Sequence, residues 1–247
     1  YEELGRGLVP GPLVWCFGRD RIATGYDASL AGSALVEFLR LVDEVLMLAP
    51  DRAFASVVES NAIVAGDAEE WPLDPLTPVW RTDKQAVSGV PCEQDFDDVW
   101  NTGALLTAAY CVGMADRLTE MAVAYAMERQ QFDRPIGSFQ AVKHICADMA
   151  VRAELARASV HAAACVMDDP ATGSLARAVA GAKLMAGEAA ILNGRSATQV
   201  YGGMGFTWEV DVHLYLKRAW VLETHFGGGA HHAAALAPTM PTRSCAQ

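Results

Sequence analysis

The stretch "MERQQFDRPIGSFQAVKHICADMAVRAELARASV" (residues 127–160) decides the fold. It holds the end of one helical pattern, a break at "FDRPIG" (132–137) and the start of a second helical pattern. Within the break, Pro135 lacks an amide hydrogen and stops a helix, and we expect Ser138 to be the N-cap of the next one. After the break, apolar residues recur at the spacing of one buried helix face: Phe139, Val142, Ile145, Met149, Ala153, Ala156, Val160 and Ala163.

The same spacing continues on both sides of this break. It predicts four long helices, at residues 97–129, 138–167, 173–199 and 210–225. Because the links between these helices are short, we expect them to form an antiparallel four-helix bundle over residues 93–247.

The residues before the bundle show a different pattern of apolar and polar residues. Residues 41–92 contain short apolar and β-branched runs, such as "EVLMLAP" (44–50) and "PVWRT" (78–82), cut by Pro, Asp and Gly. This pattern predicts a small antiparallel β unit. Residues 1–40 mix short helical patterns with Gly and Pro breaks, and we interpret them as a remnant of an N-terminal helical domain. The predicted fold class is therefore mostly α.

The composition limits the classes of partner. The chain has 247 residues, is 52% hydrophobic and 20% charged, and carries a formal net charge of -11. These values favour a large buried core, and the acidity disfavours nucleic acid and anionic membrane as partners. The longest charge-free apolar run, "ALLTAAYCVGMA" (104–115), is too short for insertion across a bilayer.

The six cysteines bear on compartment and metal binding. They show neither CxxC nor zinc-ligand spacing, so we expect a reduced, cytoplasmic protein without a metal. Because the chain begins at Tyr1 rather than at a methionine, we also expect it to be part of a longer protein or to lack its start.

Two clusters of polar residues and glycines stand at helix ends. An arginine such as Arg129, at the end of a long helix, is usually a solvated charge that complements the helix dipole. The glycine pair in "QVYGGMGFTWE" (199–209) is equally a helix C-cap followed by a turn. In a functional interpretation, bare backbone amides beside a helix end suit an anion such as a pyrophosphate.

Together, and in this order, the two clusters are specific. "RQQFDRPIGSFQAVKH" (129–144) resembles the acyl-CoA dehydrogenase pattern R-x-x-F-G-x-P-I-x-x-F-Q. The second cluster, about seventy residues later, resembles that family's Q-x-x-G-G-x-G-[FY] segment. The resemblance covers residues 93–237. It implies an FAD cofactor and a fold with an N-terminal helical region, a central β-domain and a C-terminal bundle that pairs into dimers and tetramers.

The resemblance also implies roles for single residues. Arg129 would reach the FAD pyrophosphate, Phe132 would pack on the cofactor and Gln140 would contact its adenine end. A guanidinium suits a diphosphate because it donates two parallel hydrogen bonds, and glycine lets the backbone approach closely.

The sequence departs from the family pattern at one turn residue, because the family has a glycine after the phenylalanine and this chain has Asp133. Aspartate tolerates turn conformations, so we expect the turn to survive. Three residues, Gln199, Gly202 and Gly203, would receive the dinucleotide of a neighbouring subunit. The expected cofactor-binding residues are Arg129, Gln131, Phe132, Phe139, Gln140, Gln199, Gly202 and Gly203.

The family's catalytic base is missing from the sequence. Family members remove the α-proton of a CoA thioester with a carboxylate while the β-hydrogen leaves as hydride to the flavin. The two places that carry this carboxylate fall on Gly227, within "HFGGGAHH", and on Gly103, so we expect no catalytic residue. Glu223, one turn before Gly227, is the fallback candidate, although a solvated or salt-bridged glutamate beside Lys217 and Arg218 is the favoured interpretation. The β region also lacks the family's T-E-P-x-x-G-S-D and W-I-T segments.

The remaining polar candidates have structural interpretations. Asp97 and Asp98 begin a helix, where carboxylates complement the helix dipole. No carboxylate or thiol stands at metal-ligand spacing from His225, His231 and His232, so these histidines do not indicate a metal site.

A longer segment narrows the resemblance within the family. "GFTWEVDVHLYLKRA" (205–219) resembles actinobacterial members that act on steroid side chains as α2β2 heterotetramers, in which one chain supplies the base and the other completes the FAD site. Within it, we expect Trp208 in packing and Glu209 as a charge at a helix N-terminus. The resemblance implies a base-less subunit that needs a second acyl-CoA dehydrogenase-like subunit. It also implies an acyl-CoA substrate, such as a sterol side-chain thioester, and electron-transfer flavoprotein as partner. Two alternatives stay open: a self-sufficient homotetrameric dehydrogenase with Glu223 as base, and a flavin-free scaffold protein.

Overall fold

The computed structural model describes residues 2–7, 22–28, 33–48, 55–63, 65–83, 90–91 and 95–239. The chain forms two compact units, one of residues 9–106 and one of residues 1–8 together with 107–247. We call them the β unit and the helical unit. The longest helix, α2 (Phe96–Glu128), begins in the first unit and continues into the second.

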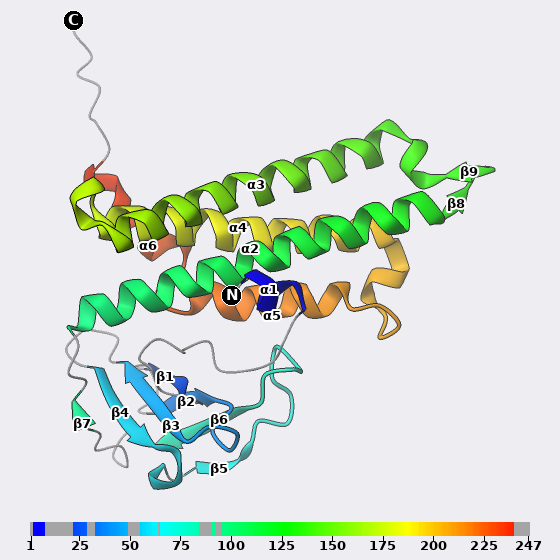
Figure 1. The fold of residues 1–247 in the computed structure, drawn as a ribbon. Coiled ribbons are helices and arrows are strands. Elements are labelled where there is room, and N and C mark those ends of the chain that lie inside the picture. Colours follow the sequence, from blue (N-terminus) through cyan, green and yellow to red (C-terminus); the bar gives the residue numbers. More distant parts are fainter. Residues whose placement is uncertain are drawn as a thin grey trace, which may run out of the picture. The chain divides into compact units, whose positions relative to one another are not determined.

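The β unit contains a seven-stranded sheet (Figure 1). Its spatial order is β5-β6-β2-β1-β3-β4-β7. The side chains that pack together in this unit include Val36, Phe38, Val45, Val58 and Trp80. The strands are β1 (Ile22–Ala28), β2 (Ser33–Glu37), β3 (Glu44–Leu48), β4 (Ala55–Glu59), β5 (Ala65–Ala68), β6 (Val79–Asp83) and β7 (Val90–Pro91).

Two features of this sheet differ from the prediction. First, β1 and β3 run parallel, with Ile22 opposite Glu44, so the unit is mixed rather than purely antiparallel. The reason is topological: β2 returns antiparallel to β1, and β3 then lies on the other side of β1 and runs in its direction. Second, β1 and β2 lie inside residues 1–40, where a helical remnant was expected. The run from Ile22 to Tyr26 alternates large with small residues, which is a strand period.

The helical unit confirms the predicted helices, with ends that shift by about two residues at most. α2, α3 and α4 run side by side in Figure 1, and a short helix α6 follows α5. Helix α6 was not predicted, because its sequence begins in the glycine run. No helix in the described ranges combines the length and apolarity that a bilayer-spanning segment needs. The helices are α1 (Glu2–Arg6), α2, α3 (Gln140–Asp168), α4 (Leu175–Tyr201), α5 (Val212–Thr224) and α6 (Gly229–Leu236).

The predicted cap of α3 is wrong by one residue. Ser138 is the last residue of a 3₁₀ turn (Ile136–Ser138), and the N-cap position of α3 belongs to Phe139. Phe139 offers no side-chain oxygen, so its backbone carbonyl accepts the first helical hydrogen bonds, from the amides of Val142 and Lys143. The 3₁₀ turn after Pro135 uses the residues that the sequence pattern had assigned to the cap.

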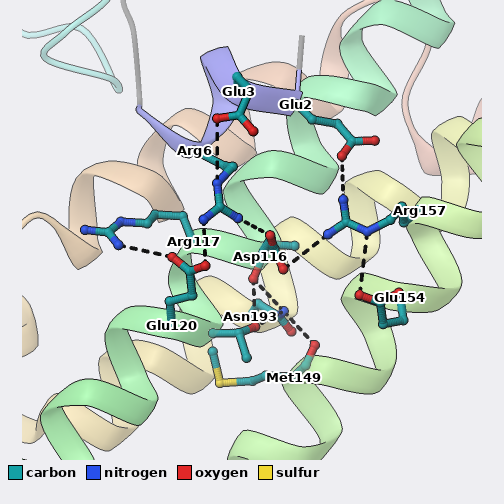
Figure 2. A network of polar contacts seen from close by, with 12 residues as sticks. Glu2, Glu3, Arg6, Asp116, Arg117, Glu120, Met149, Glu154, Arg157 and Asn193 are labelled. Carbon is teal, nitrogen blue, oxygen red and sulfur yellow. Dashed lines mark hydrogen bonds and ion pairs between the residues drawn. The ribbon is translucent and has the colours of Figure 1, made fainter.

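One buried side chain links the three longest helices. Asn193 of α4 is fully buried, and its Nδ2 lies 3.0 Å from the carbonyl oxygen of Ala115 in α2 and 2.9 Å from that of Met149 in α3 (Figure 2). The same Nδ2 lies 3.2 Å from the hydroxyl of Thr119, and the amide oxygen accepts a 2.7 Å bond from Arg152. Because buried polar groups are costly when unpaired, this set of bonds fixes how α4 sits between its neighbours.

Helix α1 belongs to the helical unit because its backbone touches α2 directly. A Cβ atom on Gly5 would overlap the carbonyl of Tyr110, and one on Gly113 would overlap that of Glu2, so only glycine allows this approach.

Ion pairs then hold α1 in place (Figure 2). Arg6 pairs with Asp116 and, at 2.6 Å, with Glu120. Helix α3 also contributes, since Arg157 pairs with Glu2 of α1 at 2.5 Å and with Asp116 of α2 at 3.2 Å. The carboxylate of Asp116 is therefore shared by two arginines from different helices.

We predict that Asn193→Ala lowers the free energy of unfolding of the helical unit by about 2–4 kcal/mol, because it leaves several buried partners unpaired. Urea unfolding followed by circular dichroism measures the loss. The matched control is Asn61→Ala in the exposed turn Ser60–Ala62, which should change stability by less than about 0.5 kcal/mol. Equal effects of the two substitutions would contradict the linking role of Asn193.

Candidate functional site

The first motif folds into a two-residue hairpin at the end of the bundle. Strands β8 (Gln130–Gln131) and β9 (Arg134–Pro135) pair across a loop of Phe132 and Asp133. These two loop residues have φ values of 52° and 60°, as a type I′ turn requires. The expectation that Asp133 preserves the turn is confirmed.

The aromatic residues of the hairpin have different surroundings. Phe139 supports the hairpin: the guanidinium carbon of Arg134 lies 4.0 Å from its ring centre, and the Phe132 ring stands edge-on to it at 6.1 Å. Phe132 itself is 86% exposed. The ring of Phe132 is therefore exposed at the tip of the turn, whereas Phe139 packs against Arg134 and Phe132 at its base.

The polar residues of the first motif are exposed on the hairpin and on the residues that flank it. Arg129, Gln131 and Gln140 all face solvent in the described structure. Gln131 donates a 2.8 Å bond to the carbonyl of Gln130, so it is held by its own backbone. Within residues 95–239 and the other described ranges, no hydrogen bond or ion pair engages the Arg129 side chain. Its guanidinium is therefore available to an anionic ligand.

The second motif forms the turn after α4. Gly202 has a φ of 61° and ends the helix in a conformation that favours glycine. At both Gly202 and Gly203, no atom lies within 4 Å of the place where a Cβ would stand. The backbone of this turn is thus open on its outer side, in contrast to Gly205, where a Cβ would lie 2.9 Å from the carbonyl oxygen of Thr198.

A pocket of about 430 Å³ lies beside this open turn. Its volume is in the range of small-molecule sites. Arg195 was missed in the sequence, although it stands four residues before Gln199 and hence on the same face of α4. In the described part of the chain the Arg195 side chain has no hydrogen-bonding or ion-pair partner. The pocket residues are Arg195, Thr198, Gln199, Gly202, Phe206 and Leu216.

The two motifs lie at one end of the bundle but do not share a pocket. The rings of Tyr125 in α2 and Tyr201 in α4 stack with centres 4.1 Å apart, and the Tyr201 hydroxyl donates to the carbonyl of Met121 at 3.2 Å. This contact holds the two helix ends together, and Figure 1 shows the β8–β9 hairpin at the same end as the turn after α4. Neither Arg129 nor Phe132 lines the Arg195 pocket.

Two aromatic residues in and beside the second motif are exposed. Trp208, predicted to pack, is 73% exposed, and Phe206 is 76% exposed. Trp208 is covered on part of its surface by Lys217, whose Nζ lies 5.1 Å from the ring centre, and by the edge of His213. The prediction of a packing role for Trp208 is wrong because the turn carries its side chain outward.

The glycine run at the end of α5 is built around a buried lysine. Lys183 of α4 is 2% exposed, and its Nζ donates to the carbonyls of Leu222 at 3.1 Å, Glu223 at 3.0 Å and Gly227 at 3.3 Å. An ammonium group at a helix C-terminus satisfies carbonyls that have no helical partner. Burial lowers the pKa of Lys183, and the three carbonyls supply the acceptors that water would otherwise provide.

The fallback base, Glu223, is occupied in the structure. Its Oε1 accepts a 2.6 Å hydrogen bond from the amide of Gly229, the first residue of α6. The carboxylate therefore caps α6, whereas the sequence interpretation favoured a solvated or salt-bridged glutamate beside Lys217 and Arg218. The difference arises because α6 brings an amide group to Glu223 that the sequence pattern did not reveal.

A side chain at the expected base position, Gly227, would be strained and crowded by two histidine side chains. Gly227 has a φ of 92°, and a Cβ there would lie 2.6 Å from Cδ2 of His231 and 3.1 Å from Nε2 of His232. His232 is held in place by a 3.0 Å bond between its Nε2 and the carbonyl of Phe226. Burial lowers the pKa of His232 to about 4, so its ring is neutral at pH 7. The second expected base position, Gly103, is buried within α2.

Other candidate residues serve the helices. Asp97 and Asp98 stand in the first turn of α2, where carboxylates complement the dipole. Among the residues that the structure describes, no group of three His, Cys, Asp or Glu side chains is arranged to hold a metal ion.

Comparison with known proteins gives a consistent set of relatives. The family model for the acyl-CoA dehydrogenase C-terminal domain matches residues 98–238. FadE34 of Mycobacterium tuberculosis, an acyl-CoA dehydrogenase, is 34% identical over 252 residues, which is 92% of this chain and 35% of FadE34. The acyl-CoA dehydrogenase IpdE2 of the same organism is 36% identical over 228 residues, which is 88% of this chain and 69% of IpdE2.

Solved structures share the fold at lower identity. The ChsE4–ChsE5 complex from Mycobacterium tuberculosis has a TM-score of 0.71 at 23% identity, covering 93% of this chain and 66% of that chain. The Tcur3481–Tcur3483 steroid ACAD has a TM-score of 0.72 at 21% identity, covering 87% of this chain and 61% of that one. The chain thus spans about a third of FadE34 and about two thirds of these other relatives.

We predict that Gly227→Ala costs at least about 1–2 kcal/mol of stability, because alanine is strained at positive φ and its Cβ would meet His231. Gly203→Ala is the matched control. It adds the same methyl group where nothing lies within 4 Å, and it should stay within about 0.5 kcal/mol of the parent. Thermal unfolding measures the stability of both variants. A Gly227→Ala variant as stable as the parent would show that this position accepts a side chain.

Proposed function

Because the chain belongs to the acyl-CoA dehydrogenase family, we propose that it is a base-less subunit of an FAD-dependent enzyme and completes the FAD site of a catalytic partner. The observation that carries this proposal is that both expected base positions, Gly227 and Gly103, are glycines, and that a side chain at Gly227 would be strained at positive φ and crowded by His231. In our proposal, the carboxylate that removes the α-proton therefore comes from a partner chain.

The exposed end of the bundle fits one part of FAD. The guanidinium groups of Arg129 and Arg195 are available to phosphate oxygens, and the backbone at Gly202 and Gly203 is open to close approach. The exposed ring of Phe132 offers a flat apolar surface to a planar group. These features suit the adenosine diphosphate part of the cofactor. When bound, FAD accepts the β-hydrogen of the acyl chain as hydride.

The separation of the two motifs supports a shared site between subunits. Arg129 and Phe132 stand on the hairpin, whereas Gln199 and Gly202 line a different pocket at the same end of the bundle. In our proposal, the hairpin contacts one dinucleotide and the Arg195 pocket contacts the dinucleotide of a neighbouring subunit. The chain's own residues bind and orient the cofactor, and the partner holds the proton acceptor.

The two alternatives fit the structure less well. A homotetrameric enzyme with Glu223 as base would need this carboxylate to leave its 2.6 Å bond to the Gly229 amide and uncap α6. A flavin-free scaffold would leave two exposed arginines and an open glycine turn without a purpose. Neither alternative explains why a closed glycine and an open glycine turn occur together.

The relatives support a substrate class and a partner class. One structural relative is a steroid ACAD and another is a complex of two differently named chains, ChsE4 and ChsE5. We infer that the substrate is a bulky CoA thioester, such as a sterol side-chain fragment, and that the assembly is α2β2. Electron-transfer flavoprotein is the electron acceptor that the family implies.

The first test compares the chain alone with the chain co-expressed with a base-bearing acyl-CoA dehydrogenase subunit. We expect FAD absorbance and dye-coupled oxidation of CoA thioesters only in the complex.

In that complex, Glu223→Gln should keep the turnover rate within a few-fold of the parent rate, whereas removal of a general base commonly lowers the rate by about 10²–10⁴-fold. Turnover by the isolated chain, or a collapse of turnover in Glu223→Gln with FAD still bound, would favour the homotetramer.

A second test concerns Arg129 in the assembled complex. Arg129→Ala should weaken FAD affinity by roughly tenfold to a hundredfold, because a hydrogen bond to a charged group is worth about 1.5–3 kcal/mol. The matched control is Arg177→Ala, an exposed arginine in the first turn of α4 and outside both motifs. Flavin release on dilution measures both variants. Equal FAD affinities in the two variants would remove Arg129 from the proposed site.

A further inference from the structure

Each of the two motifs is fixed to the end of one helix by a close backbone contact. In the 3₁₀ turn after the hairpin, a Cβ atom on Gly137 would lie 2.9 Å from the carbonyl oxygen of Ala126 in α2. In the turn after α4, a Cβ atom on Gly205 would lie 2.9 Å from the carbonyl oxygen of Thr198 in α4. Because only glycine permits such an approach, the backbone of each turn lies directly against the helix that precedes it.

The stacked tyrosines join these two helix ends. The rings of Tyr125 in α2 and Tyr201 in α4 are 4.1 Å apart and 14° from parallel. Tyr125 stands one turn before Arg129, whose amide donates a 2.9 Å hydrogen bond to the Tyr125 carbonyl. Tyr201 stands directly before Gly202, the residue that ends α4. The stack therefore links the helix turn that carries Arg129 to the first residue of the glycine turn.

The hydroxyl of Tyr201 adds a second contact to the same link. It donates a 3.2 Å hydrogen bond to the carbonyl of Met121, one turn before Tyr125 in α2. Burial raises the pKa of Tyr201, so the hydroxyl stays protonated at pH 7 and remains a donor. Both tyrosines are half-buried, so the stack lies at the edge of the packed core.

One pair of rings thus sets the position of two binding elements that share no pocket. A charge-assisted bond to a phosphate depends on distance and angle, and a site that is loose by about 1 Å loses much of it. The supporting contacts of Arg129 and of the glycine turn therefore matter for binding as well as for stability.

We propose that Tyr201 is a positioning residue for both motifs, because its stack on Tyr125 holds Arg129 and the glycine turn at a fixed separation. Tyr201 itself touches no cofactor in this account. The inference rests on the proposed function, in which the hairpin contacts one dinucleotide and the Arg195 pocket contacts the dinucleotide of a neighbouring subunit.

A double-mutant cycle on FAD affinity tests this role in the complex with the base-bearing subunit. Arg129→Ala alone should weaken FAD affinity by roughly tenfold to a hundredfold. In a Tyr201→Leu background, the same substitution should cost roughly threefold or less, because the guanidinium is already displaced. Flavin release on dilution measures all four complexes. Additive losses would overturn the positioning role.

The same cycle with Arg195→Ala examines the second motif. We expect Tyr201→Leu to reduce the effect of this substitution as well, since the pocket lies beside the turn that Tyr201 precedes. Coupling of Tyr201 to one arginine alone would overturn the claim that the stack positions both motifs.

Two further variants separate positioning from a general loss of stability. Tyr201→Phe keeps the ring and loses only the hydroxyl bond, so its FAD affinity should stay within roughly threefold of the parent. The matched control is Tyr215→Leu, since Tyr215 is buried and donates a 2.6 Å bond to the carbonyl of Arg6 in α1. It should leave the Arg129→Ala loss at about tenfold or more. A control that removes this loss, in a complex that circular dichroism shows to be folded, would count against a specific role of Tyr201.

Hydrogen exchange tests the same inference in the chain without FAD. The amide of Ile136, after the hairpin, and the amide of Thr207, after the glycine turn, both donate backbone hydrogen bonds. Tyr201→Leu should speed the exchange of both amides by about twofold to tenfold, the range that corresponds to the energy of an aromatic stack. Tyr201→Phe should leave them unchanged. The amide of His232 in α6, which bonds the carbonyl of Gly228, is the internal control and should not respond.

Failure of the inference and failure of the proposed function give different results. If Arg129→Ala leaves FAD affinity unchanged in the otherwise parent complex, the proposed function is wrong, and hydrogen exchange still decides the role of Tyr201. If Arg129→Ala weakens FAD binding but its effect adds to that of Tyr201→Leu, the proposed function stands and the positioning role is wrong. Unchanged exchange of Ile136 and Thr207 in Tyr201→Leu would also overturn the positioning role.

Discussion

The buried amide of Asn193 is the interaction on which the rest of the helical unit depends. It bonds backbone carbonyls of α2 and α3 from the middle of α4, so the three longest helices can pack in only one register. A buried amide tolerates no sliding, because any shift leaves several polar groups unpaired at once. The fixed register is what lets Tyr125 and Tyr201 stack at one end of the bundle and lets Lys183 reach the end of α5.

Two regions of α4, around Lys183 and around Gln199, have opposite characters. At Lys183 the chain is closed: the ammonium group holds three carbonyls, Glu223 caps α6, and His231 and His232 fill the space beside Gly227. About 24 Å along the same helix, at Gln199, the chain is open, with an uncovered glycine turn and exposed aromatic rings. The function that we propose, a subunit that binds a dinucleotide but removes no proton, requires only the open region at Gln199.

Exposure of apolar side chains is the other recurring feature of the helical unit. Phe132, Phe206 and Trp208 at the open end and Val151 and Leu155 on α3 lie more than half in solvent in the single chain. In the proposed function, the exposed rings at the open end contact the cofactor or a partner chain. Charged side chains, by contrast, find partners within the chain. Asp116 pairs with Arg6 of α1 and with Arg157 of α3, so ion pairs bind α1 to the helical unit.

The sequence by itself determined the helices, the hairpin turn at Asp133 and the glycine at the base position, because these follow from local periodicity, turn propensity and residue identity. It did not determine what depends on neighbours brought in by the fold. The 3₁₀ turn displaced the cap from Ser138, the strand order made β1 and β3 parallel, and α6 gave Glu223 a backbone partner. Arg195 lines a pocket only because the turn after α4 folds beside it, and Gly227 is crowded only because His231 and His232 lie next to it. Hydrogen bonds and packing between distant segments have no signature in local sequence, so these features were decided by tertiary structure alone.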